Sequence, residues 1–231
     1  MSSYRPSRAS IHHLSPYQVT NPPDSNGAPS STGLVVHWAA RYDLLIALLT
    51  LGRERRFRQR LLELAHVEAG ESVLDIGCGT GTLAIAAKRV VGDSGVVHGI
   101  DASPEMIARA RRKAKRLGIN VVFEMAQAQS LPFPDARFDL VLSTVMLHHL
   151  PRAARAQAVR DARRVLKPGG RVLAVDFVRR SGKGLLAHFH RHGRVDPRDL
   201  IALVTEAGLT VIESGPVGRW DLQFVLGRRE A

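Results

Sequence analysis

A glycine-rich turn between an apolar run and the start of a helical pattern constrains this chain most. Residues 73–81 read Val-Leu-Asp-Ile-Gly-Cys-Gly-Thr-Gly. Closely spaced glycines let the backbone adopt positive φ and let a ligand approach main-chain atoms. The spacing is G-x-G-x-G, whereas dinucleotide folds use G-x-G-x-x-G and a phosphate loop ends in Gly-Lys followed by Ser or Thr. The turn therefore predicts a ligand that carries no pyrophosphate.

An acidic residue ends the next predicted strand. Asp101 follows the apolar run at 96–100 and lies about 20 residues past the glycine turn, where a carboxylate can accept hydrogen bonds from ribose hydroxyls. The alternative role for Asp101 is to cap the helix that comes next. Ser103, which immediately precedes Pro104, is better placed for that role. We therefore expect Asp101 to bind the ligand.

Apolar runs alternate with amphipathic helical patterns through the middle of the chain, which is typical of an α/β fold with a parallel sheet. After a connector, Asp196 begins a helix that ends before Gly208, and two strands joined by a short link should form an antiparallel hairpin. We expect a seven-stranded, mostly parallel sheet with helices on both faces. The predicted strands are 72–76, 96–100, 121–125, 138–143, 171–177, 210–214 and 220–226.

The length of 231 residues, with 45% hydrophobic residues, is enough for one substantial core. Residues 1–33, rich in Ser, Pro, Asn and Gly, are expected to be a disordered arm before a single domain at 34–231. No run approaches the roughly 20 apolar residues of a membrane span, and no secretory leader is evident. We therefore expect a cytoplasmic protein. Within the domain we expect leading helices at 34–66, a ligand-binding core at 67–177, a substrate-side connector at 178–195, and a C-terminal helix and hairpin at 196–231.

The net charge of +12 suggests attraction to phosphate-rich partners, either nucleic acid or an anionic membrane surface. The alternative is that arginine simply serves as a solvated helix residue. Aromatic interleaving of the kind that stacks exposed bases is absent around the basic runs, which argues against nucleic acid. The single cysteine, Cys78, excludes a disulfide framework and a cysteine-rich metal site.

Four motifs of the chain form one recognisable set. They are VLDIGCGTG at 73–81, GIDAS at 99–103, the segment 126–151 with AQAQSLPFPDARFDLV and STVMLHHLP, and RRVLKPGGRVLAVDF at 163–177. Together they resemble the class I S-adenosylmethionine-dependent methyltransferases. The resemblance is greatest to the branch of ubiquinone and menaquinone biosynthesis, and it implies a Rossmann-like fold and S-adenosylmethionine as cofactor.

This resemblance implies a set of cofactor-binding residues. The glycine turn and Thr80 would face the methionine part, Asp101 the ribose, Gln127 and Ala128 the adenine, and Thr144 the methyl group. Gln127 departs from the Asp or Asn that is common in the family, although its amide oxygen can still accept a hydrogen bond. The full set is Asp75, Gly77, Gly79, Thr80, Gly81, Asp101, Ala102, Gln127, Ala128 and Thr144.

A sulfonium methyl group is already activated, so transfer needs mainly an aligned nucleophile in a dry pocket. His148 and His149, just after the fourth predicted strand, are candidate bases. The alternative is that one packs or caps a helix while the other is solvated. Tyr42 could close the pocket, or it could be an ordinary core residue. The alternating histidines at 188–192 lack nearby carboxylates or cysteines, so no metal site is expected.

The methyl acceptor is less constrained than the cofactor. Where the quinone branch has Asn, Asp and His in its leading helices, this chain has Ile46, Ala47 and Glu54. Our first hypothesis is an enzyme that methylates a small, apolar metabolite, a lipid or a quinone-like molecule. The alternatives are an RNA or protein methyltransferase, suggested by the basic charge, and a non-catalytic cofactor-binding subunit. The oligomeric state cannot be predicted from the sequence.

Overall fold

The computed structural model describes residues 54–177, 197–218 and 222–231. The N-terminal arm, the leading helix around Tyr42, and Ile46 and Ala47 lie outside the described residues. The connector with its three alternating histidines lies outside them too.

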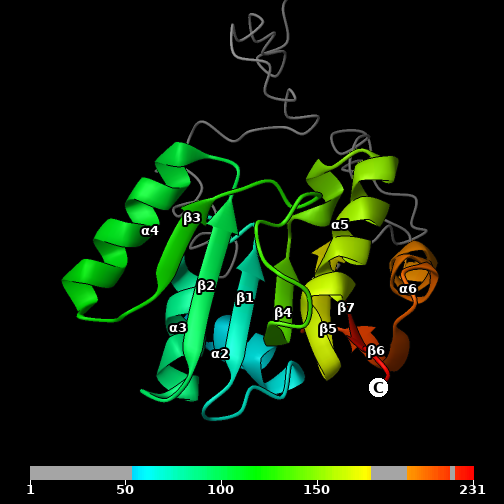
Figure 1. Cartoon of the computed structure of the whole chain (residues 1–231), viewed down its shortest axis with the longest axis horizontal. Coiled ribbons are helices and arrows are strands. Elements are labelled where there is room, and N and C mark those ends of the chain that lie inside the picture. Colours follow the sequence, from blue (N-terminus) through cyan, green and yellow to red (C-terminus); the bar gives the residue numbers. More distant parts are fainter. Residues whose placement is uncertain (1–53, 178–196, 219–221) are drawn as a thin grey trace, which may run out of the picture. The chain divides into compact units, whose positions relative to one another are not determined.

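The strands form one seven-stranded sheet in the order β3-β2-β1-β4-β5-β7-β6 (Figure 1). The five strands from β3 to β5 are parallel, and β7 pairs antiparallel with both β5 and β6. This confirms the predicted seven-stranded sheet with antiparallel C-terminal strands. The strands are β1 (Ser72–Ile76), β2 (Val96–Asp101), β3 (Val122–Met125), β4 (Phe138–Thr144), β5 (Leu166–Phe177), β6 (Thr210–Pro216) and β7 (Leu222–Arg228).

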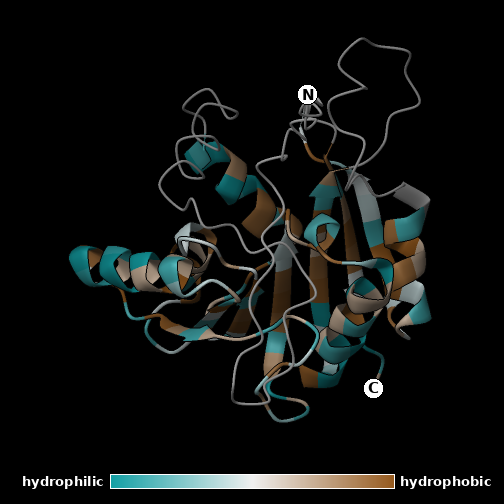
Figure 2. Ribbon diagram, turned by 90° about the horizontal axis from the view of Figure 1, so that it is seen from above, coloured by the Kyte–Doolittle hydropathy of each residue, from teal (hydrophilic) through white to brown (hydrophobic). Residues whose placement is uncertain are grey.

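Helices cover both faces of the sheet. One cluster of buried residues joins α2, α3 and α4 to the strands, and a second cluster joins α5 and α6 to the opposite face. Hydrophobic residues line the strands and the inner sides of the helices, whose outer sides are hydrophilic (Figure 2). The helices are α2 (Glu54–Leu64), α3 (Thr82–Val91), α4 (Pro104–Leu117), the 3-10 turn η1 (Leu147–His149), α5 (Arg152–Val165) and α6 (Pro197–Glu206).

The strand order predicts that a ligand binds at the centre of the sheet. The chain first moves outward from β1 to β2 and β3, and then returns to place β4 on the other side of β1. At such a reversal the connections leave the carboxyl ends of two neighbouring strands in opposite directions, and ligands bind in the crevice between them. The ends of β1 and β4 are therefore where a site is expected.

The largest difference from the predicted elements is at β5, which begins at Leu166 and not at 171. Leu166 pairs with Phe138, and the register then shifts before Arg171 pairs with Leu140. Gly169, with φ +78°, donates its amide hydrogen to the Arg229 carbonyl at 2.8 Å. The Pro-Gly-Gly segment thus belongs to an irregular strand because the C-terminal segment supplies its backbone partners.

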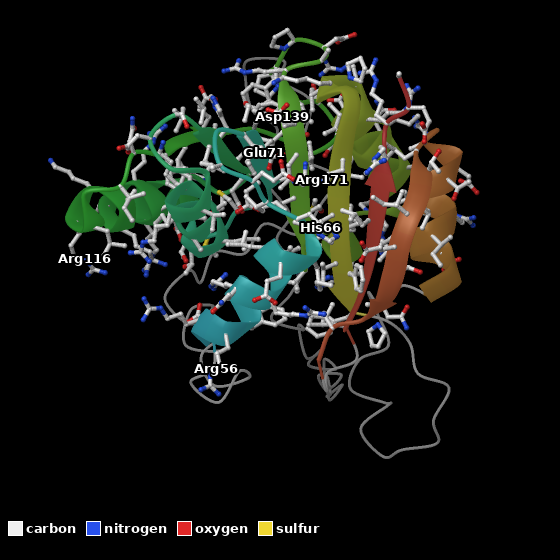
Figure 3. All side chains as sticks on the ribbon, turned by 90° about the horizontal axis from the view of Figure 1, so that it is seen from below. Arg56, His66, Glu71, Arg116, Asp139 and Arg171 are labelled. Carbon is white, nitrogen blue, oxygen red and sulfur yellow. The ribbon has the colours of Figure 1, made fainter. Side chains whose placement is uncertain are left out.

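Arg171 connects the end of α2 to the amino ends of the central strands, at the opposite end of these strands from the predicted site. Arg171 of β5 binds Glu71 at 2.7 Å and donates to the Ala65 carbonyl at 2.7 Å. Arg171 also donates to the carbonyl of His66, and the labelled residues His66, Glu71 and Arg171 lie together at this end of the strands (Figure 3). This anchor fixes where α2 lies relative to β1. Among the described helices, none is long and apolar enough to cross a membrane.

Candidate functional site

The glycine turn connects β1 to α3 in a conformation that favours glycine. Gly77, Gly79 and Gly81 have φ values of 69°, 53° and 75°, in the left-handed region that other residues rarely adopt. A Cβ on Gly77 would lie 2.3 Å from Cγ of Met146, and one on Gly81 would lie 2.5 Å from the ring of Phe123. At Gly77 and Gly81, the positive φ and the lack of room for a Cβ atom therefore both require glycine.

Asp101 holds this turn from the end of β2. Its Oδ2 accepts a hydrogen bond from the Gly79 amide and its Oδ1 accepts one from the Ser103 amide, both at 2.9 Å. Burial raises the pKa of Asp101, although these two backbone hydrogen bonds oppose the rise. Ser103 caps α4 by accepting from the Met106 amide at 3.3 Å, as predicted. Asp101 is therefore not the cap of α4, and each of its oxygens retains a lone pair for a ligand.

A cavity lies between the glycine turn, the ends of β1 and β4, and α2. Asp75 is completely buried beside it, and its Oδ2 has no hydrogen-bond partner among the described atoms. Burial raises the pKa of Asp75 to about 7, opposed by Arg58 and reinforced by Asp101. A buried, unpartnered carboxylate oxygen is costly, so it indicates a missing donor. The lining residues are Phe57, Arg58, Leu61, Asp75, Gly77, Cys78, Thr80, Thr82, Leu83, Thr144 and Val145.

The backbone at the end of β4 is strained beside this cavity. Val145 has a φ of 55°, which is a genuine outlier for a β-branched residue. Its amide donates to the Val175 carbonyl at 2.7 Å, so the neighbouring strand holds it. Thr144 lines the same cavity. Strained residues of this kind concentrate at functional sites.

Gln127 and Ala128 follow β3, directly after a residue whose backbone contacts Asp101. The Ala126 amide donates to the Asp101 carbonyl at 3.1 Å, and Gln127 pairs with Ser130 in a short bridge. The Gln129 amide nitrogen already donates to Oε1 of Gln127 at 2.7 Å. One lone pair of that oxygen remains for an adenine amino group. The adenine role of this loop stays a prediction.

The two histidines of the predicted site have different surroundings. His148 Nδ1 lies 2.6 Å from Oδ1 of Asp176, and the His148 amide donates to Oδ2 of the same carboxylate at 2.9 Å. The ring centroids of His148 and His149 are 3.9 Å apart. Burial, and then the neighbouring His148, lower the pKa of His149 to about 4. His149 is therefore neutral at pH 7 and a weak base.

The sequence interpretation missed two residues, Asp176 beside His148 and Arg58 at the cavity. Asp176 is fully buried; the only signal for it was an acidic residue within the apolar run of β5. Arg58 lines the cavity, although the sequence suggested a solvated helix residue like its arginine neighbours. The sequence pattern that could have identified Arg58 is its spacing to Leu61 and Leu62, which places all three residues on one side of a helix. Within the described ranges, no cluster of His, Cys, Asp or Glu could hold a metal ion.

Comparison with known protein families shows which kind of domain this site resembles. Residues 73–170 match the model of a methyltransferase domain. These residues are therefore similar to a methyltransferase domain. The matched segment begins in β1 and ends within β5, so it includes the glycine turn, Asp101 and the end of β4.

Curated relatives agree with this assignment. The domain is 42% identical over 139 residues to demethylmenaquinone methyltransferase of Thermus thermophilus, covering 60% of this chain and 62% of the relative. It is 37% identical over 163 residues to the ubiquinone/menaquinone biosynthesis C-methyltransferase UbiE of Pseudomonas putida, covering 70% of this chain and 63% of the relative. The chain thus spans less than two thirds of the length of these relatives.

Solved structures share the fold at lower identity. A SAM-dependent methyltransferase from Aquifex aeolicus superposes with a TM-score of 0.64 at 23% identity, covering 74% of this chain and 88% of that chain. The [4+2]-cyclase SpnF superposes with a TM-score of 0.68 at 21% identity, covering 77% and 81%. At these identities the likeness concerns the fold alone. The methyltransferase fold is confirmed by both sequence and structure.

Proposed function

We propose that this protein transfers the methyl group of S-adenosylmethionine to a small, apolar, quinone-like acceptor. The observation that carries the proposal is the cavity at the ends of β1 and β4, where the glycine turn meets the unpartnered Oδ2 of Asp75. The described residues fit that cofactor. Asp101 binds the Gly79 amide of the turn and keeps lone pairs for a ligand, and the turn admits close contact to its backbone.

The cofactor would lie across the carboxyl ends of the central strands. Gly77, Gly79, Thr80 and Gly81 would contact its methionine part, with Asp75 below them. Asp101 and the adjoining Ala102 would bind the ribose, and the Gln127–Ala128 loop would meet the adenine. Thr144 would lie beside the methyl group, since it lines the same cavity as the turn. This arrangement is supported by the hydrogen bond between Asp101 and Gly79.

When bound, S-adenosylmethionine supplies a methyl group on a sulfonium that an acceptor can attack in line. In such a transfer the bond from this carbon to sulfur would break as the bond to the acceptor forms, and the acceptor would lose a proton. We propose that His148 Nε2 receives that proton. Asp176 supports this role, because a hydrogen bond from Nδ1–H to the carboxylate leaves Nε2 unprotonated and stabilises the imidazolium that forms.

His149 and Tyr42 have secondary parts in this proposal. His149 packs against His148 as a neutral ring, and its low pKa makes it the poorer base. Tyr42, from outside the described residues, would close the acceptor side of the pocket.

The acceptor class is inferred from the relatives, whose names refer to demethylmenaquinone, ubiquinone and menaquinone. The apolar lining of Phe57, Leu61 and Leu83 suits such a molecule. Glu54, which replaces the family His, forms an ion pair with Arg58 within α2. We therefore expect an acceptor related to these quinones and not identical with them. We further propose a cytoplasmic protein that associates peripherally with anionic membranes, supported by the net charge of +12.

The proposed function can be tested with methyl-labelled cofactor and a fractionated cell extract. We expect label in the quinone and lipid fraction, with little in RNA or protein. A variant with His148 replaced by Ala serves as the control for transfer by the enzyme itself. Label that enters RNA or protein would refute the small-molecule acceptor. Binding of cofactor without label in any fraction would support a non-catalytic subunit.

A further inference from the structure

Helix α4 carries a row of cations on the side that faces away from the sheet. The opposite side packs into the core, through side chains that recur every three or four residues: Met106, Ile107, Ala110 and Ala114. Helical geometry directs a second set of positions outward. Four of them are basic: Arg109, Arg112, Lys115 and Arg116. Figure 3 shows Arg116 at the outer end of α4, pointing away from the sheet.

The cations of this row have no acidic partner in the part of the chain that the structure describes. The ion pairs among described residues involve other side chains, at α2, α5 and the strands. Cations in the last turn of a helix complement its dipole, which accounts for Lys115 and Arg116. Arg109 and Arg112 lie further from the end, where that effect has faded. The helix dipole therefore does not explain the whole row.

The arginines of α5 are used differently, although α4 and α5 have the same length of 14 residues. Arg163 donates to the Gly208 carbonyl at 3.0 Å, and Arg164 binds Asp161 at 2.6 Å. Arg155 donates to a carbonyl just before the helix at 2.7 Å. Most arginines of α5 thus hold neighbouring segments in place. The outward row of α4 has no such role within the described residues.

Exposed apolar side chains lie along the same edge of the sheet. Leu117, the last residue of α4, is 45% exposed, and Val122 and Met125, the first and last residues of β3, are 41% and 64% exposed. β3 is an edge strand, and α4 lies beside it (Figure 1). Arg111 fixes the helix to this strand by donating to the Phe123 carbonyl at 3.0 Å. This edge therefore combines cations with exposed aliphatic side chains.

Cations beside aliphatic side chains suit the surface of an anionic lipid membrane. Acidic headgroups attract Lys and Arg, and aliphatic side chains enter the boundary between headgroups and acyl chains. Nucleic acid would also attract the cations, but exposed bases stack on aromatic side chains. The one aromatic residue of α4 and β3 is Phe123, which is buried. The composition of this edge therefore favours a membrane over nucleic acid.

We propose that α4 and the turn from α4 to β3, which we call the α4 edge, form the surface that binds an anionic membrane. The basic row lies among the acidic headgroups, and Leu117 inserts beside them. This inference rests on the proposed function, which includes peripheral membrane association, and it names the surface. Among the described residues that line the cavity, none belongs to α4 or β3. The cavity therefore stays open to cofactor and acceptor when the α4 edge is bound.

The test measures sedimentation of the full chain with vesicles of phosphatidylcholine, with and without phosphatidylglycerol. The unchanged protein should bind mainly the vesicles that contain phosphatidylglycerol, and binding should weaken as salt rises. Arg112→Gln combined with Arg116→Gln should weaken it by roughly tenfold or more, because each cation near an anionic surface contributes about fivefold. Leu117→Ser should weaken it by about threefold, at high salt as well as at low salt.

The matched control is Arg152→Gln combined with Arg160→Gln, which removes the same charge from exposed positions of α5 on the other face of the sheet. This control should lose less than about twofold, because charges far from the membrane are screened. An equal loss in the control would show that net charge alone drives binding, and would overturn the α4 edge. All variants should keep the thermal stability and the S-adenosylhomocysteine affinity of the unchanged protein.

Two further outcomes would overturn the α4 edge. One is full vesicle binding by the α4 double variant. The other is a loss that appears only in binding to a single-stranded RNA oligonucleotide, which would assign the basic row to nucleic acid. If the unchanged protein binds neither kind of vesicle, membrane association fails together with this surface. Methyl transfer and cofactor binding are measured separately, so that failure is distinguishable from failure of the proposed enzymatic function.

Discussion

His148 Nδ1 lies 2.6 Å from Oδ1 of Asp176, a carboxylate with no exposed surface. The same carboxylate accepts a hydrogen bond from the His148 amide at 2.9 Å. Both the ring and the backbone of His148 are thus held by one residue of β5. The pair resembles the carboxylate-histidine arrangement that orients an imidazole for proton transfer.

The first prediction concerns this pair. His148→Ala should lower kcat by about a hundredfold or more, which is typical for loss of a general base. Asp176→Asn should lower it by at least about tenfold, because an amide no longer fixes the tautomer with Nε2 free. In both variants the affinity for S-adenosylhomocysteine, measured by calorimetry, should stay within about twofold of that of the unchanged protein.

The double variant separates positioning from folding. If Asp176 acts through His148, the two losses should be far from additive in kcat. Thermal unfolding of each variant serves as the control for stability. Fully additive losses would mean that Asp176 contributes to the fold and not to proton transfer.

The second prediction concerns pH and Asp75. Its pKa is raised to about 7 by burial, from an ordinary value of 3.8, so the folded protein binds this proton more tightly than the unfolded chain does. The stabilisation from this carboxyl is complete below pH 4 and is lost as the pH rises through about 7. Asp75→Asn should therefore gain stability relative to the unchanged protein across this window. Denaturant unfolding of both proteins from pH 5 to pH 8 would show how their difference in unfolding free energy depends on pH. A difference that stays constant over this range would contradict the prediction.

The third prediction concerns Asp101 and cofactor affinity. Asp101→Ala should weaken S-adenosylhomocysteine binding by roughly tenfold or more, since it removes a charged acceptor and frees the Gly79 amide from its partner. Asp93, an exposed carboxylate in the loop before β2, provides a matched control as Asp93→Ala. Calorimetry would measure both. Unchanged affinity in Asp101→Ala would place the ribose elsewhere.

The fourth prediction concerns the glycine turn. Gly77→Ala should destabilise the protein by about 1–3 kcal/mol, because the added Cβ combines a positive φ with overpacking. The clash is with Met146, whose Cγ would lie 2.3 Å from the new atom. Gly118→Ala is the control, since Gly118 has a φ of 65° and nothing within 4 Å of its Cβ position. Thermal unfolding should show a larger loss for Gly77→Ala, and only that variant should lose cofactor binding.

Much of the fold could be predicted from local patterns in the sequence. The apolar run at 72–76 became β1 with the predicted bounds, and the other six strands appear close to where they were expected. The resemblance to methyltransferases, which rested on four sequence motifs, agrees with the family model that matches residues 73–170. The individual roles of the site residues, Tyr42 and the arm at 1–33 stay predictions.

Other features needed the tertiary structure. The sequence predicted a C-terminal hairpin, but its second strand, β7, lies between β5 and β6. The hydrophobic pattern of a strand predicts which face is buried and says little about which neighbour it pairs with. Similarly, β5 begins at Leu166 because Phe138 and Arg229 supply its backbone partners.

The secondary-structure elements and the glycine turn could be read from the sequence, because they depend on short-range geometry: periodicity, positive φ and capping. Which side chains meet depends on how these elements pack. Asp176 reaches His148 because β4 and β5 are adjacent, and Arg58 reaches the cavity of Asp75 because α2 packs over β1 and α3. Such pairings join distant segments whose side chains carry no local signal of their partners, and the burial that makes them energetically significant exists only once the sheet and helices have packed.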